Sequence, residues 1–201
     1  MTEPAGAHVS DRWAEWRRRV ELDEYHRRWE RMAERGEATH GEADFIEALA
    51  PTSVLDAGCG MGLVAIELHR RGIDVEGVDL DDDLLHYARL SAPHLTWHHS
   101  DLATMQLDRS FHVVAMPGNV MLFCRDEVRG TIVDRAAAHL QHLGLLVAGF
   151  SLDQRPGALT LDEYDALCAG TGLELVDRFA TWERDPYAGQ DYAVSVHRLV
   201  R

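Results

Sequence analysis

The sequence predicts an α/β fold with a doubly wound, seven-stranded, mostly parallel sheet, a C-terminal antiparallel hairpin and N-terminal helices. Three observations predict it. Strand-like apolar runs alternate with helix-like segments from residue 50 onward, which is typical of a parallel sheet covered on both faces. A glycine-rich turn at 58–62 joins the first such strand to a helix. The last two strand-like runs are joined by a connection so short that only an antiparallel pair can use it.

Length and composition agree with one well-buried domain. The chain has 201 residues, 46% of them hydrophobic, and no apolar run approaches the ~20 residues that a membrane span needs. The first residues lack a charged start and an apolar stretch, so we expect no signal peptide. Three scattered cysteines, Cys59, Cys124 and Cys168, predict reduced thiols in a cytoplasmic protein.

The charge balance disfavours several partners. The net charge is −14. Apart from histidine, every basic side chain is an arginine, and the chain contains no lysine. A field of that sign repels phosphate backbones and anionic membranes, so we expect neither nucleic acid nor membrane as a partner. The twelve histidines show no ligand spacing with carboxylates or cysteines, so no metal site is predicted.

Residues 1–49 are predicted to form an N-terminal helical lid or cap, before a main domain at 50–201. Residues 9–35 have a helical pattern in two apolar stripes on nearly opposite faces, with a phase slip near 20–22. The helix therefore either bends there or is apolar on two sides. This favours packing on the domain and on a neighbouring subunit, as in a homodimer, or a lid whose aromatics line a substrate pocket. A glycine at 36 ends this helix.

The remaining elements follow in order along the chain. A short helix from 42 to 49 precedes the first strand, and the strand predicted at 111–116 is nearly all apolar, as a central parallel strand must be. The other expected strands are 73–79, 94–98, 145–150, 173–182 and 192–199, and the other expected helices begin at 63, 82, 127 and 161 and end near 68, 90, 143 and 168.

The domain is organised around Val54-Leu-Asp-Ala-Gly-Cys-Gly-Met-Gly62, which reads as a strand, a turn and a helix start. Its glycines permit positive φ and let backbone N–H groups approach a ligand, and the positive end of the following helix points at the same space. Asp56 places a negative charge beside this turn, which suits a cationic ligand better than a phosphate. A dinucleotide fingerprint would have its third glycine where this chain has Leu63.

The spacing D-x-G-x-G-x-G from Asp56 to Gly62 resembles motif I of the class I (Rossmann-like) S-adenosylmethionine-dependent methyltransferases. The resemblance implies an enzyme that moves a methyl group from S-adenosyl-L-methionine to a small-molecule acceptor by in-line displacement. The cofactor-binding residues it implies are Asp56, Gly58, Cys59, Gly60, Gly62, Asp79, Leu80, Asp101, Leu102, Met116 and Asn119.

Four of these residues have more specific expected roles. Asp79 lies 21 residues beyond Gly58, the offset at which an acidic residue reaches a ribose, and by resemblance it bridges both ribose hydroxyls while Leu80 covers one adenine face. Asp101 and Leu102 resemble the family's adenine clamp. Capping of the next helix is the alternative role for each aspartate.

The stretch Met116-Pro-Gly-Asn-Val120 occupies the place of motif IV, where a backbone carbonyl typically meets the cofactor's ammonium. It lacks the Asn-Pro-Pro-Tyr sequence of amino-directed DNA and protein-glutamine methyltransferases, which disfavours those substrates further. Asn119 either contacts the methionine carboxylate or the acceptor, or forms the turn for which asparagine is chosen.

No catalytic base is distinguished by its spacing. Weak candidates are His40, His26, Tyr25 and Tyr187, and many such enzymes need only alignment of the reactants. By resemblance His40 and Glu42 lie near the active site, although helix capping explains them equally well. Four aromatic residues are candidate pocket walls that suit a small, partly apolar or cationic acceptor: Trp13, Trp16, Trp29 and Phe123.

Two other functions stay open. A methyltransferase-like partner or sensor could bind the cofactor without transferring its methyl group, because the catalytic base is weakly defined. An NAD(P)-dependent oxidoreductase is less favoured because of the missing glycine at 63. Fold alone does not identify the substrate.

Overall fold

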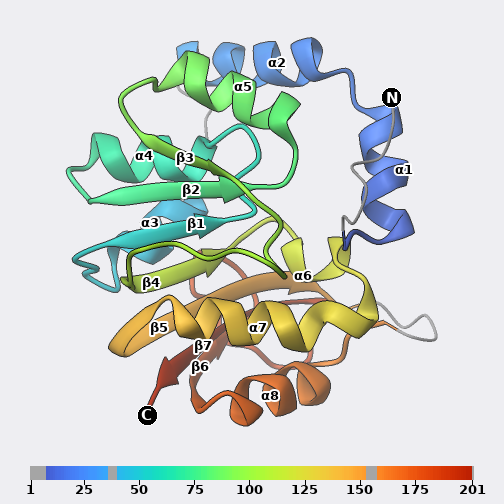
Figure 1. The fold of residues 1–201 in the computed structure, drawn as a ribbon, viewed down its shortest axis with the longest axis vertical. Helices are drawn as coiled ribbons and strands as arrows, with labels where there is room; N and C mark the ends of the chain where they lie inside the picture. Colours follow the sequence, from blue (N-terminus) through green and yellow to red (C-terminus); the bar gives the residue numbers. More distant parts are fainter. Residues whose placement is uncertain (1–7, 36–39, 153–157, 201) are drawn as a thin grey trace.

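The computed structural model describes residues 8–35, 40–152 and 158–200, without the side chains of 29, 30, 33 and 34. Seven strands form one sheet in the order β3-β2-β1-β4-β5-β7-β6 (Figure 1). β7 is antiparallel to both of its neighbours, and all other pairs are parallel. This confirms the predicted sheet and its C-terminal hairpin. The strands are β1 Val54–Ala57, β2 Val75–Asp79, β3 Thr96–His99, β4 Phe111–Met116, β5 Leu140–Ser151, β6 Leu173–Phe179 and β7 Tyr192–Leu199.

Helices cover both faces of the sheet, because successive residues of a buried strand point to opposite sides. Leu146 and Ala148 of β5 pack in one core with α7 and α8, whereas Leu145 and Val147 pack in a second core with α3 and α4. Within the described ranges, no helix is both long and apolar enough to cross a bilayer. The helices are α1 Asp11–Arg19, α2 Leu22–Glu34, α3 Gly41–Glu47, α4 Leu63–Arg70, α5 Asp82–Ser91, α6 Val120–Phe123, η1 Asp126–Val128, α7 Arg129–Ala138 and α8 Leu161–Gly170.

The N-terminal segment contains two helices. The break falls at Val20, whose backbone is extended (φ −88°, ψ 118°), at the position of the predicted phase slip. Figure 1 shows α2 lying along α5 and α1 running beside α6. The rings of Trp16 and Phe123 lie 6.1 Å apart, and the Ser10 backbone N–H donates to the Phe123 carbonyl at 2.7 Å. Tyr87 of α5 donates to Asp23 of α2, so both helices are held against the main domain. The expected helix end at Gly36 lies outside the described residues.

The prediction of a helix over 127–143 was wrong for the last third of that range. The helical part ends at Ala138, and β5 already begins at Leu140, which pairs with Phe111 of β4. The Phe111 backbone N–H donates to the His139 carbonyl at 2.7 Å, so pairing with the central strand decides the conformation of this segment. Leu143 then adopts a φ of 61° at an irregularity in the strand. The short helix α6 was not predicted.

Candidate functional site

A cavity of about 670 Å³ lies at the carboxyl ends of β1, β2 and β4. Doubly wound sheets bind ligands at this edge, and the volume is typical of a small-molecule site. The glycine-rich turn and Asp79 form one wall, and Pro117 and Gly118, which follow β4, form another. Residues of α1, α2 and α3 cover it, among them Trp13, Trp16, Tyr25, His26, His40 and Glu42.

The three glycines of the turn have different surroundings. Gly60 has a φ of +54° and lines the cavity. The space that a Cβ would occupy there is open. Gly58 also lines the cavity, and a Cβ there would lie 2.6 Å from Val120 Cγ2. Gly62, with φ +80°, does not line the cavity. It faces Trp97 instead, since a Cβ there would meet the Trp97 ring at 2.4 Å. Gly62 thus permits helix packing, and its predicted cofactor contact stays a prediction.

Asp56 is the most unusual group of the site. Its side chain is 1% exposed, and Oδ2 accepts a hydrogen bond from the Ala65 backbone N–H at 3.1 Å. Oδ1 is buried without any hydrogen-bond partner among the described residues. Burial raises the pKa of Asp56 to about 7, and the negative charges of Asp79 and Glu42 add to this effect. A buried, unpartnered oxygen beside a cavity calls for a donor or a cation from a ligand.

Asp79 lies at the end of β2, where both of its oxygens bind backbone. Oδ2 accepts from the Gly60 N–H at 2.8 Å and Oδ1 from the Asp81 N–H at 2.9 Å, which fixes the carboxylate at the cavity wall. Burial raises its pKa to about 6. Leu80, the next residue, does not line the cavity, and its carbonyl lies 3.0 Å from His99 Nε2.

The predicted adenine clamp is not open to the cavity. Asp101 Oδ2 accepts from the His8 backbone N–H at 2.9 Å, and Oδ1 accepts from the Ala103 N–H at 2.8 Å. Leu102 is 7% exposed, and neither residue lines the cavity. The segment at His8 therefore lies over this carboxylate.

In the motif IV stretch, neither Met116 nor Asn119 lines the cavity, and their predicted cofactor contacts stay predictions. Met116 is buried in β4, and Asn119 Oδ1 accepts from the Ser151 backbone N–H at 2.7 Å. With a φ of 67°, Asn119 starts α6 and ties the turn to β5. The cavity is lined instead by Pro117, Gly118 and Val120.

Three of the four candidate bases line the cavity, namely Tyr25, His26 and His40, together with Cys59 of the glycine turn. Tyr187 lines a separate cavity of about 380 Å³ beside the start of α8. Trp13, Trp16 and Phe123 line the main cavity, while the side chain of Trp29 lies outside the described part of the chain. In that part, no three His, Cys, Asp or Glu side chains are placed to hold a metal ion.

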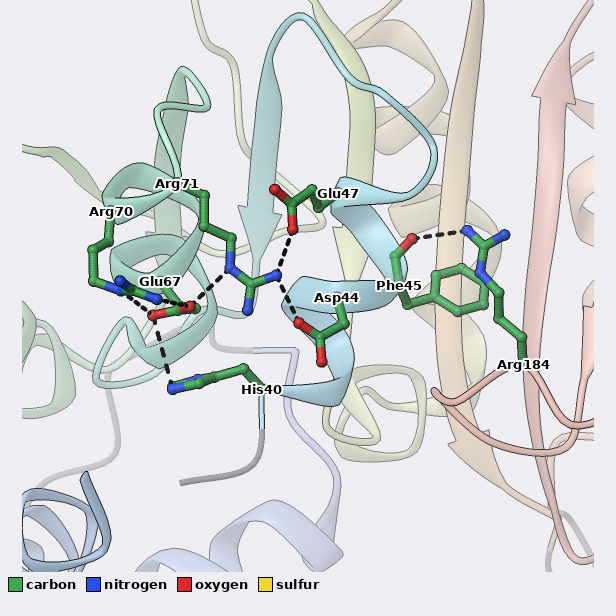
Figure 2. A network of polar contacts seen from close by, with 8 residues as sticks. All are labelled: His40, Asp44, Phe45, Glu47, Glu67, Arg70, Arg71 and Arg184. Carbon is green, nitrogen blue, oxygen red and sulfur yellow. Dashed lines mark hydrogen bonds and ion pairs between the residues drawn. The ribbon is translucent and has the colours of Figure 1, made fainter. Parts of the chain in front are cut away.

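A network of ion pairs holds α3 and α4 together at one side of the cavity (Figure 2). Glu67, whose side chain is 6% exposed, accepts from Arg70 and from Arg71 at 2.7 Å, and lies 3.8 Å from His40 Nε2. The hydrogen bonds from Arg70 lower the pKa of Glu67 to about 2. The sequence carries no signal for Glu67 and Arg70 as cavity residues, because their exposure to it depends on where the N-terminal helices lie.

Comparison with known proteins places these features in context. Residues 54–144 match the family model described as a methyltransferase domain. A solved TehB-like SAM-dependent methyltransferase from Corynebacterium glutamicum is 32% identical, with a TM-score of 0.78 over 87% of this chain and 96% of that one.

Two curated relatives match over shorter stretches. The dTDP-3-amino-3,4,6-trideoxy-α-D-glucopyranose N,N-dimethyltransferase of Streptomyces venezuelae is 32% identical over 108 residues, which are 52% of this chain and 46% of that protein. The magnesium-protoporphyrin O-methyltransferase of Rhodobacter capsulatus is 41% identical over 68 residues, which are 31% of this chain and 30% of that protein. The chain thus spans less than half the length of each of these two relatives.

Proposed function

The chain belongs to the class I S-adenosylmethionine-dependent methyltransferases, and from this premise we propose that it transfers a methyl group from S-adenosyl-L-methionine to a small-molecule acceptor. The observation that carries the proposal is the unpartnered Oδ1 of Asp56 at the wall of the cavity. The cofactor brings an ammonium group that would satisfy this oxygen, and no phosphate that would repel it.

The residues at the cavity fit the two halves of the cofactor. Asp56 would hold the methionine ammonium, and the open face of Gly60 leaves room for the chain of the ligand. Each Asp79 oxygen accepts one backbone hydrogen bond, which leaves lone pairs for the two ribose hydroxyls. Adenine contacts by Leu80, Asp101 and Leu102 are part of the proposal, and for Asp101 they require the His8 segment to move aside.

The bound cofactor supplies an electrophilic methyl group on a sulfonium, so the protein has to align the acceptor and exclude water. We infer that residues 1–49 serve this purpose as a lid over the main domain at 50–201. Trp13 and Trp16 of α1 and Tyr25 of α2 line the cavity, and Trp16 lies edge-on to Tyr25, with ring centroids 6.1 Å apart. Such a wall excludes water while it shapes the space for the acceptor.

Further parts of the proposal concern the assembly and the compartment. All three cysteines are free and buried in the structure, which supports a cytoplasmic protein with reduced thiols. We also propose that the N-terminal helices form a homodimer, and that neither nucleic acid nor membrane is a partner, in line with the net charge of −14.

The function is tested by incubating the purified protein with methyl-labelled cofactor and a library of small amines, alcohols, phenols and thiols. We expect one class of acceptor to become labelled while S-adenosylhomocysteine accumulates in equal amount. If the cofactor binds but no acceptor is ever labelled, the chain is a cofactor-binding partner or sensor. If the cofactor does not bind, the proposed function is wrong.

A further inference from the structure

One carboxylate in the cavity has no role in the cofactor contacts proposed above. Glu42, in the first turn of α3, makes no hydrogen bond or ion pair within the described part of the chain and lines the cavity. By contrast, Glu67 is neutralised by two arginines, and Asp79 accepts two backbone hydrogen bonds. A half-buried carboxylate without a partner favours a cationic ligand.

Glu42 lies on the side of the cavity away from the proposed adenosine contacts. Its charge adds to the burial that raises the pKa of Asp56, at the end of β1. It also adds to the burial that raises the pKa of Tyr192, at the start of β7, to about 12. The proposed adenosine contacts lie on the opposite side of β1, at the ends of β2 and β3. Glu42 therefore lies in the part of the cavity that the proposed adenosine contacts leave free.

The element that carries Glu42 is held from two sides, as Figure 2 shows. Arg71 forms ion pairs at 2.7 Å with Asp44 and Glu47 of α3. On the other side, Arg184 donates to the Phe45 carbonyl at 3.1 Å and lies 4.7 Å from the centre of the Phe45 ring. The helix that carries Glu42 is thus held in place before any ligand binds, which lowers the entropic cost of binding.

The rest of this space is aromatic. Trp16 packs edge-on against Tyr25 and at a tilt against Phe123, and all three residues line the cavity together with Trp13. Aromatic faces attract cations, most strongly where water is excluded. A hydroxyl acceptor would leave the Glu42 charge without a counter-ion, whereas an ammonium ion would neutralise it.

Resting on the proposed function, we propose that the methyl acceptor is an aliphatic amine, bound as its ammonium ion with Glu42 as counter-ion and the aromatic residues of α1 and α2 as its apolar wall. Before it can attack, the ammonium must lose a proton, and His40 is placed to accept it. His40 lies two residues before Glu42 and lines the same cavity.

The proposed reaction proceeds as follows. The proton moves from the ammonium to the imidazole of His40, whose Nε2 lies 3.8 Å from Glu67 Oε2. The amine lone pair forms a bond to the methyl carbon as the carbon–sulfur bond breaks, and that electron pair stays on sulfur as the thioether. The product leaves as the N-methylammonium ion. His40, with a side chain 39% exposed, returns its proton to water.

The test uses the full chain with S-adenosylhomocysteine bound, titrated with matched pairs such as cyclohexylamine and cyclohexanol, or benzylamine and benzyl alcohol. Tryptophan fluorescence and calorimetry report binding. We expect each amine to bind at least tenfold more tightly than its alcohol. Glu42→Gln should abolish that preference while leaving the affinity for S-adenosylhomocysteine within about threefold. Glu24→Gln, an equal loss of charge at an exposed position of α2, is the matched control and should change neither.

Three outcomes would overturn the inference: amines that bind no better than alcohols, a preference that survives in Glu42→Gln, or a Glu42→Gln variant that loses the cofactor product instead. His40→Gln provides a further arm. It should reduce kcat for any amine that is methylated and leave KM nearly unchanged. If S-adenosylhomocysteine gives no heat with the folded protein, the proposed function itself fails, which is a separate result.

Discussion

At the scale of single residues, the site depends on two carboxyl groups buried in one cavity. The pKa values of Asp56 and Asp79 are raised to about 7 and about 6, above the ordinary value of about 3.9 for aspartate. Their contribution to folding is therefore fully present below about pH 3.9 and is lost as the pH rises through 6 to 7. A cationic ligand in the cavity reverses this balance, because it favours the charged carboxylates.

The first prediction concerns the pH dependence of cofactor binding. Binding of S-adenosylmethionine should release protons below pH 7, and its Kd should fall with rising pH by up to about tenfold per unit until Asp56 is ionised. Calorimetry at pH 6 to 8 in buffers of different ionisation enthalpy measures both quantities. Asp56→Asn should bind more weakly and show a flatter profile. A Kd for the original protein that does not change over this range would contradict the assignment.

The second prediction separates two glycines of the same motif. Gly62→Ala forces a Cβ against Trp97 at a positive φ, so the free energy of unfolding should fall by about 2 kcal/mol or more. Gly60→Ala meets no protein atom, so it should cost only about 1–2 kcal/mol from its backbone conformation, yet weaken cofactor binding at least tenfold. Denaturant unfolding and calorimetry measure the two effects. Undiminished affinity in Gly60→Ala would show that its open face is not used.

At the scale of elements, α1 is fastened to the domain by charged hydrogen bonds. Arg17 Nε donates to Asp81 at 2.7 Å, and Nη2 donates to Asp83 at the same distance, at the start of α5. The carboxylate of Asp81 also caps α5 by accepting from the Asp83 N–H. Arg17 thus connects the lid to the element that follows the proposed ribose-binding aspartate.

The third prediction tests that connection. Arg17→Ala should increase hydrogen–deuterium exchange in α1 and raise KM for the acceptor several-fold, while the midpoint of global unfolding changes little, because α1 lies outside both hydrophobic cores. Arg19→Ala, which removes an exposed pair with Glu15 within α1, is the control. Equal effects of the two variants would mean that Arg17 acts only through the stability of its own helix.

The elements differ in how far their sequence determines them. β4 could be predicted to its ends because five of its six residues are apolar, and in the structure those five are buried while His112 is half-buried. The start of β5 could not, because Leu140 and Leu143, three residues apart, also fit a helix, and only pairing with Phe111 decides between the two. Tertiary contacts outweighed the local pattern there.

The site shows the same division. The sequence predicts four of the cavity residues, because each lies at the end of a predicted strand or in the glycine-rich turn. All four line the cavity, namely Asp56, Gly58, Gly60 and Asp79. The position of His8 over Asp101, 93 residues away in sequence, could not be predicted from periodicity. The same holds for the exposure of Glu67 and Arg70 to the cavity. These features depend on where the N-terminal segment packs.

At the scale of the whole molecule, a net charge of −14 surrounds a cavity lined by four carboxylates and one arginine. Such a field raises the local concentration of cations and speeds their association. The methyl donor carries two positive groups and one negative group, whereas its demethylated product carries one of each. The molecule as a whole therefore favours the donor over the product in electrostatic terms.

The central claim is that this cavity binds S-adenosylmethionine through Asp56 and Asp79, and calorimetry with the purified chain at pH 8 tests it most directly. The account predicts saturable binding of one molecule per chain by the original protein. It also predicts loss of that binding in Asp79→Ala, whose circular dichroism should be unchanged. No heat with either the donor or S-adenosylhomocysteine, from protein that is demonstrably folded, would contradict it.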